Sequence, residues 1–152
     1  MVALVPTIAG VVLRGAFYFG TLDECNWEVH VGFGTIFSHR AARLARHVSV
    51  GAYCVLGQVH IGAGAKIGSH VSVPSGKRQH LNRNGELCEQ GSYDTVRIGE
   101  QAWIGDGAIV VADVGHHCIV GAGAVVSDPV PPMRIAVGNP ARMLDTKVKL
   151  PA

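Results

Sequence analysis

The sequence predicts an all-β protein built as a parallel β-helix of hexapeptide repeats. Aliphatic residues recur every six positions in three separate stretches, led by Ile61, Ile98 and Val120. Glycine directly follows most of these lead residues and accounts for 20 of the 152 residues, nearly twice the ordinary share of about 7%. A period of six fits neither a helix, with about 3.6 residues per turn, nor a simple strand, with a period of about two.

Each hexapeptide is expected to form a short strand followed by a turn. The lead aliphatic residue points inward, and glycine suits the turn because it can adopt a positive φ. The residue four positions after the lead also fits a narrow interior, because it is small or β-branched; these residues are Ala65, Val71, Ala102, Ala108 and Ala124. Three strands would close one coil, and stacked coils would pair their backbones and bury a continuous aliphatic row.

The length suits one domain with three segments. Residues 1–30 lack hexads and are expected to cap the open end of the coil with a short helix and an irregular strand. Residues 31–132 form the β-helix, and a loop over about 75–96 is extruded from it. That loop is predicted because Ile98 follows Val73 by 25 positions rather than by a multiple of six.

The C-terminal segment, residues 133–152, is expected to form a turn and a short helix. The motif PVPP at 129–132 should end the ladder of strands, because proline cannot donate a backbone hydrogen bond. Pro140 follows Gly138-Asn139 and suits the first position of a helix.

Composition and charge exclude several kinds of function. Thirteen basic residues face eleven acidic ones, and no run of lysine and arginine stands out, so a broad surface for nucleic acid is not expected. The four cysteines are too widely spaced for a metal knuckle and are expected to be reduced thiols. The apolar N-terminus is a poor signal peptide and too short to span a bilayer, which predicts a cytoplasmic protein.

Three stretches of the sequence resemble the hexapeptide-repeat acyltransferases: IGEQAWIGDGAIVVADV, IVGAGAVVSDPVPP and AVGNPARML. The resemblance covers roughly residues 31–145. FYFGTLDEC and FGTIFSH are also similar to a subgroup tied to bacterial surface-polysaccharide synthesis. The resemblance implies a left-handed β-helix, a homotrimer with active sites between neighbouring subunits, acetyl-CoA as donor and a small acceptor of the sugar type.

Acetyl transfer to a hydroxyl or amine needs a base, and histidine suits this role because its usual pKa is about 6.5. His80, in the extruded loop, matches the position of the catalytic histidine in sugar acetyltransferases of this family. The galactoside and maltose members have His-Pro there, whereas this chain has His80-Leu81, which leaves the acceptor open. A solvated loop histidine is the alternative interpretation. His39 is the second candidate: it could line the same cleft from a neighbouring subunit, or simply cap a coil.

The resemblance also implies the other site residues. Gln79 and Asn82 flank His80 and could hydrogen-bond the acceptor. Trp103 matches the family's tryptophan beside the active site. The residues implied for the cofactor are Gly105 and Asp106 at its thiol end, Ala122 and Ser127 along the pantetheine, and Arg142 at the phosphates.

Two other functions remain open at this stage. Some trimeric β-helix proteins bind zinc through three histidines and act as carbonic anhydrases, but they use a histidine pair five positions apart that this sequence lacks. No metal is therefore expected. The chain could also be a non-catalytic β-helix. A covalent acyl-enzyme is disfavoured because no cysteine stands beside a candidate base in the sequence.

Overall fold

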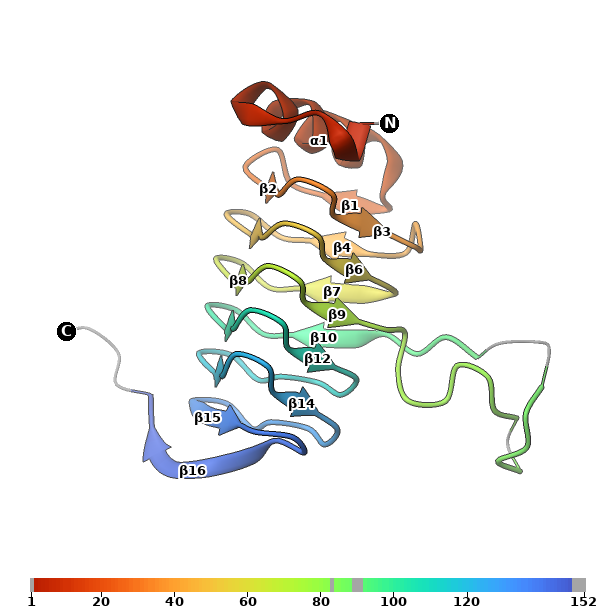
Figure 1. The fold of residues 1–152 in the computed structure, drawn as a ribbon, viewed down its shortest axis with the longest axis vertical. Coiled ribbons are helices and arrows are strands. Elements are labelled where there is room, and N and C mark those ends of the chain that lie inside the picture. Colours follow the sequence, from red (N-terminus) through yellow and green to blue (C-terminus); the bar gives the residue numbers. More distant parts are fainter. Residues whose placement is uncertain (1, 83, 89–91, 149–152) are drawn as a thin grey trace.

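The computed structural model describes residues 2–82, 84–88 and 92–148, which wind into a solenoid of stacked coils (Figure 1). In this part of the chain the strands form three sheets. Sheet A contains β1 (Glu24–Cys25), β4 (Arg43–Leu44), β7 (Val59–Ile61) and β10 (Val96–Ile98). Sheet C contains β3 (Ile36–Phe37), β6 (Val55–Leu56), β9 (Ser72–Val73), β12 (Ile109–Val110) and β14 (Val125–Val126).

Sheet B is the longest and runs the length of the solenoid. Its parallel strands are β2 (His30–Val31), β5 (Ser49–Val50), β8 (Lys66–Ile67), β11 (Trp103–Ile104), β13 (Ile119–Val120) and β15 (Arg134–Val137). The chain visits sheets A, B and C in turn, so each coil has three corners. We call them the A/B, B/C and C/A corners after the sheets they join.

The predicted inward-facing residues form the core. The lead residues and the small residues four positions later are all at most 4% exposed: Ile61, Ala65, Ile67, Val71, Val73, Ile98, Ala102, Ile104, Ala108, Val110, Val120, Ala124 and Val126. Residues one coil apart pair directly, as Ile104 does with Ile67 and Val120. The hexapeptide pattern therefore predicted both the strands and the core.

The glycines after the lead residues have a different role from the expected one. Gly51, Gly68 and Gly105 do not have a positive φ. They allow close stacking of the coils, since a Cβ on Gly51 would lie 2.5 Å from the carbonyl carbon of Gly68. The positive φ falls two residues later, for example at Tyr53 and Gly107.

We expect Gly51→Ala to destabilise the solenoid, because its Cβ would meet backbone atoms of the next coil rather than a movable side chain. Such overpacking typically costs about 1–3 kcal/mol in the free energy of unfolding. Gly20→Ala in α1 (Thr7–Thr21) is the matched control, because no described atom lies within 4 Å of its added Cβ. Urea unfolding should show a loss for Gly51→Ala only, and equal stability of the two variants would contradict this account.

The N-terminal segment covers the first coil. A 3-10 helix, η1 (Val2–Leu4), precedes α1, and α1 lies across the end of the solenoid (Figure 1). The buried Arg14 joins these parts: its Nε donates to the Val31 carbonyl at 2.8 Å and its NH1 to the Val5 carbonyl at 2.7 Å. The first coil includes β1 and β2 and so begins before residue 31. No helix of the described residues is long and apolar enough to cross a membrane.

The C-terminal end differs from the prediction. The motif at 129–132 does not end the ladder, because buried Val130 bridges to Val114 and β15 follows it. Pro129 precedes Val130, and Pro131 and Pro132 lie in the turn between Val130 and β15, so none of the three stands within a strand. The expected short helix is absent from residues 133–148, the described part of this segment. Instead, β16 (Arg142–Lys147) pairs antiparallel with β15, because the open edge of β15 offers hydrogen-bond partners that a helix would leave unused.

The outer face of sheet A carries a row of paired charged residues. Glu24, Arg43, His60 and Arg97 occupy successive rungs of the ladder. Two ion pairs flank His60 in this row: Arg43 with Glu24 and Arg97 with Asp113, each with a nitrogen–oxygen distance of 3.8 Å. His60 therefore lies between two guanidinium groups.

We expect this placement to make stability depend on pH through His60. Its pKa is lowered from its usual value by burial first and then by Arg43 and Arg97, with Glu24 opposing. The unfolded chain, with an ordinary pKa of about 6.5, then binds the proton more tightly than the folded one. The free energy of unfolding should therefore fall as pH is lowered through about 6.5. Urea unfolding from about pH 5 to about pH 8 should show a shallower slope in His60→Gln, and an unchanged slope would contradict the assignment.

Candidate functional site

The extruded loop leaves the solenoid at the C/A corner, between β9 and β10, as predicted (Figure 1). Its strands fold back on each other, with a bridge between Leu81 and Leu87 and a hydrogen bond of 2.9 Å from the Cys88 amide to the His80 carbonyl. His80 itself is exposed. The loop thus holds the backbone of His80 in a defined hairpin and leaves its side chain exposed.

The hydrogen bonds of Asn82 lie within the loop. Its Oδ1 accepts from the amides of Asn84 and Glu86 at 2.9 and 3.0 Å, and its Nδ2 donates to the Glu86 Oε2 at 2.8 Å. Gln79 donates to the Gly76 carbonyl at 3.5 Å, close to the limit for a hydrogen bond. Asn82 therefore shapes the turn beyond His80, and Gln79 is the more available of the two for an acceptor.

A side-chain ion pair joins the base of the loop to the coils. Lys77 Nζ lies 3.1 Å from Asp128 Oδ1, and this hydrogen bond, followed by one from Ser127, lowers the pKa of Asp128. The Asp94 amide donates to the Ser75 carbonyl at 3.0 Å. Ser127 belongs to this same corner, since its Oγ lies 3.1 Å from Asp128 Oδ2.

His39 reaches the loop from two coils away within the same chain. Its ring contacts Tyr93 with centroids 4.5 Å apart, and its Nδ1 lies 3.0 Å from Ser38 Oγ. His39 is half-buried. The sequence left open whether His39 lines the cleft from a neighbouring subunit or caps a coil, whereas the fold of one chain places it against Tyr93 of the loop.

The residues expected at the thiol end and the pantetheine lie on another part of the surface. Trp103 is on β11 in sheet B with its side chain 55% exposed. Gly105, Asp106 and Ala122 follow at the B/C corner, and Asp106 Oδ1 accepts from the Ser69 amide at 2.7 Å. A Cβ added to Gly107 or Gly123 would meet no described atom within 4 Å. We call this open strip, residues 105–107 and 121–123, the glycine edge.

One chain does not bring the two groups together. Ser127 and His39 lie at the C/A corner, where the loop that carries Gln79 and His80 leaves the solenoid, whereas Trp103 and the glycine edge lie along sheet B and the B/C corner. Arg142 is exposed on β16 at the C-terminal end. The period of six did not reveal this separation, although counting strands by threes along the repeats would have done so.

The cysteines divide into two kinds. Cys25, Cys54 and Cys118 are buried, and burial raises the pKa of all three thiols, that of Cys25 to about 11. They are therefore unsuited to nucleophilic chemistry. Cys88 is half-buried and stands across the loop hairpin from His80, a proximity that the sequence spacing did not reveal.

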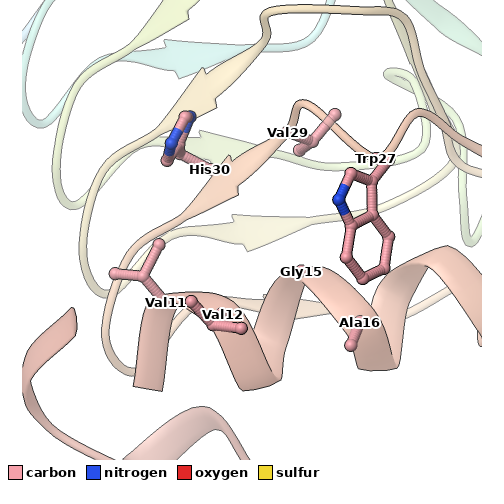
Figure 2. A pocket seen from close by; sticks show the side chains of 7 residues that line it. All are labelled: Val11, Val12, Gly15, Ala16, Trp27, Val29 and His30. Atoms are coloured by element: carbon pink, nitrogen blue, oxygen red, sulfur yellow. The ribbon is translucent and has the colours of Figure 1, made fainter. Parts of the chain in front are cut away.

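A separate apolar pocket lies between α1 and the first coil (Figure 2). Val12, Ala16, Trp27 and Val29 contribute to its lining, and His30 is at its rim. It shares no residue with either predicted group. In residues 2–82, 84–88 and 92–148, no three side chains of histidine, cysteine, aspartate or glutamate converge as metal ligands would.

The comparisons with known proteins support the fold assignment. No family model matches the chain. A maltose O-acetyltransferase from Clostridium difficile 630 has a similar structure, with a TM-score of 0.83 and 20% identity over 97% of this chain and 81% of that one. The fold is the left-handed parallel β-helix of the hexapeptide-repeat acetyltransferases. The predicted fold and the predicted likeness are thus confirmed.

Two further relatives are also named acetyltransferases. A hexapeptide-repeat acetyltransferase from Vibrio cholerae, complexed with acetyl coenzyme A, has a TM-score of 0.69 and 19% identity over 97% of this chain and 82% of that one. The galactoside O-acetyltransferase of Escherichia coli K12 is 33% identical over 66 residues, which are 42% of this chain and 30% of that protein. The matched segments span less than a third of the curated relatives' own length.

Proposed function

We propose that this protein is an acetyl-CoA-dependent acyltransferase that moves the acetyl group to a hydroxyl or amine of a sugar-type acceptor. The observation that carries the proposal is the extruded loop with His80 on a fold shared along 97% of the chain with a maltose O-acetyltransferase. The names of that protein and of the galactoside O-acetyltransferase support a sugar acceptor. We place the reaction in the synthesis of cell-surface glycans.

In the proposed reaction His80 acts as the general base. Its neutral imidazole takes the proton from the acceptor hydroxyl or amine while that atom attacks the thioester carbonyl. The tetrahedral intermediate collapses by breaking the carbon–sulfur bond, and the CoA thiolate leaves and takes up the proton that the His80 imidazolium holds, which returns His80 to its neutral form. Such a positioned base typically contributes about 10²–10⁴ in rate.

The glycine edge fits the extended arm of coenzyme A. The absence of side chains at Gly107 and Gly123 lets a ligand lie directly against the backbone. Arg142, further along the solenoid, presents an exposed guanidinium whose geometry suits phosphate. Ser127, which the resemblance implies for the pantetheine, lies instead at the C/A corner, but Gly105, Asp106, Ala122 and Arg142 follow one direction, from the thiol end to the phosphates.

We further propose that the active site is completed between copies in a homotrimer. A site that uses both His80 and the glycine edge needs two chains, because the two lie at different corners. An interface that joins the C/A corner of one chain to the B/C corner of the next is heterologous, and three copies can close it into a ring.

Mixing two inactive variants should restore activity if this arrangement is right. His80→Ala removes the base, and Ala122→Trp fills the glycine edge. In randomly mixed trimers, a site joining an intact His80 to an intact edge forms at about a quarter of the interfaces, so about a quarter of the wild-type rate is expected. The measurement is the acetylation rate after co-expression, with the size of the assembly checked by light scattering. No recovery in assembled mixed trimers would contradict a shared site.

The test of the proposed function is calorimetry with acetyl-CoA on the wild type and on His80→Ala. Both should bind with equal affinity, because His80 is assigned to chemistry rather than to the donor. An acceptor screen with sugars then follows on the wild type. If the wild type binds no acetyl-CoA at millimolar concentration, the proposed function is wrong.

A further inference from the structure

We propose that the stacked rings of Tyr53 and His70 form a platform for a flat ring of the acceptor, just beyond the thiol end of the glycine edge. This inference rests on the proposed function and names an acceptor subsite for it. The proposal rests on a column of turn residues along the B/C corner. Side-chain rings fill one part of this column, and glycines leave the next part open.

The column consists of the same turn position in successive coils. Gly34, Tyr53, His70, Gly107 and Gly123 all have φ between 56° and 71°. Their amides follow one register: the Tyr53 amide donates to the Phe33 carbonyl, that of His70 to Ala52 and that of Gly107 to Ser69, each at 2.8 Å. The side chains at this position therefore lie above one another along the solenoid.

The rings in the column lean toward the N-terminal end. A Cβ on Gly34 would lie only 2.6 Å from the Tyr53 ring, so Tyr53 covers the coil before its own. His70 in turn stacks on Tyr53, with centroids 5.3 Å apart and planes only 12° from parallel. Gly107 comes next and carries no side chain that could cover His70 from the other direction. The face of His70 turned toward Gly107 is thus left open by the next coil.

Positive φ alone does not mark this place. His47, Gln101 and His117 have the same conformation at the A/B corner. The distinguishing feature of the B/C corner is the near-parallel pair of rings that ends at an open glycine. Near-parallel rings in offset contact are a favoured aromatic arrangement, and a third flat ring can extend such a stack.

The platform lies next to the residues assigned to the thiol end of the cofactor. Asp106 accepts a hydrogen bond from the amide of Ser69, the residue before His70. The other assigned cofactor residues, Ala122 and Arg142, lie in the opposite direction along the chain. A cofactor bound along the glycine edge would therefore place its thioester beside His70. The molecule that receives the acetyl group must then occupy the space beyond the thioester.

The ligand that fits this platform is a molecule with a flat ring, one face of which is available for stacking. Either the apolar face of the acceptor sugar or an aromatic base attached to it could supply that ring. Thymidine 5′-diphosphate and maltose serve as probes that separate these two sources. With ¹³C-labelled histidine, the bound probe should shift the NMR signal of the His70 ring and leave that of His117 unchanged.

The matching variants are His70→Gly and Tyr53→Gly, with His117→Gly as control. Glycine is what the fold already uses at this turn position in Gly34, Gly107 and Gly123, so the turn is preserved in all three variants. We expect His70→Gly to weaken binding of the active probe about tenfold and to leave acetyl-CoA binding unchanged. His117→Gly should change neither.

Three results would overturn the platform. An equal loss of acetyl-CoA affinity in His70→Gly would assign the ring to the donor instead. The absence of any shift at His70 with either probe, in protein that binds acetyl-CoA, would reject the platform and leave the proposed function intact. If wild-type protein binds no acetyl-CoA, the proposed function itself fails and the inference fails with it.

Discussion

Replacing His80 with alanine is expected to lower the turnover number for acetyl transfer by about 10²–10⁴. The reason is local: the exposed ring is assigned to take the acceptor proton, and no other group in the reaction scheme replaces it. The loop should keep its shape in the variant, because the Cys88 amide bonds to the His80 carbonyl rather than to its ring. The affinity for acetyl-CoA should stay unchanged.

The measurement is single-turnover acetylation of an acceptor found by the screen, with calorimetry for donor binding. His116→Ala, which removes an exposed histidine at the A/B corner, is the matched control and should keep the wild-type rate. If His80→Ala remains as active as this control and His39→Ala loses activity, His39 is the base instead. In that case the half-buried ring against Tyr93 would be the reacting one.

The position of Cys88 allows a second mechanism, which the same protein can be used to test. Because Cys88 stands across the hairpin from His80, transfer through an acetylated Cys88 thiol is the alternative scheme to be tested. Direct transfer predicts that the intact mass of the protein is unchanged after mixing with acetyl-CoA alone. An acetyl adduct on Cys88 that reacts on with the acceptor would contradict direct attack and replace it with a two-step scheme.

The fold could be predicted because the hexapeptide pattern encodes it repeatedly. Each coil repeats the same requirement for an inward aliphatic residue, such as Ile104, and a small one, such as Ala108. The ends carry no such repetition. The last segment was assigned a helix from Pro140 alone, whereas the open edge of β15 decides its conformation, and an edge is a property of the folded neighbour rather than of the local sequence.

The site could be predicted in part for a similar reason. A break in the rhythm revealed the extruded loop and so directed attention to His80. The separation of His80 from Trp103 depends on which corner each coil turn occupies, and this follows only from the three-fold count of strands. The six-residue spacing does not indicate the stack of His70 on Tyr53, because it joins residues one whole coil apart.

Replacing Arg14 with leucine is expected to lower the free energy of unfolding by about 2–4 kcal/mol. Arg14 is 1% exposed and donates to the carbonyls of Val31 and Val5. Val31 belongs to β2, the terminal strand of sheet B, so Arg14 satisfies part of the open edge of the solenoid. Leucine would keep apolar packing and leave two carbonyl groups without a donor, each costing about 1–3 kcal/mol when buried.

The loss in the free energy of unfolding should be measured by urea unfolding, and hydrogen exchange should show which part of the structure is destabilised. Faster exchange is expected in α1 and in the amides of the first coil, whereas the core amides around Ile104 should stay protected. Arg40→Leu is the control, because Arg40 is 82% exposed on its side chain and meets Asp23 at 3.7 Å, a surface pair worth at most about 1 kcal/mol. If Arg14→Leu is as stable as Arg40→Leu, the edge of the first coil does not depend on this side chain, and the apolar packing of α1 alone holds the N-terminal end in place.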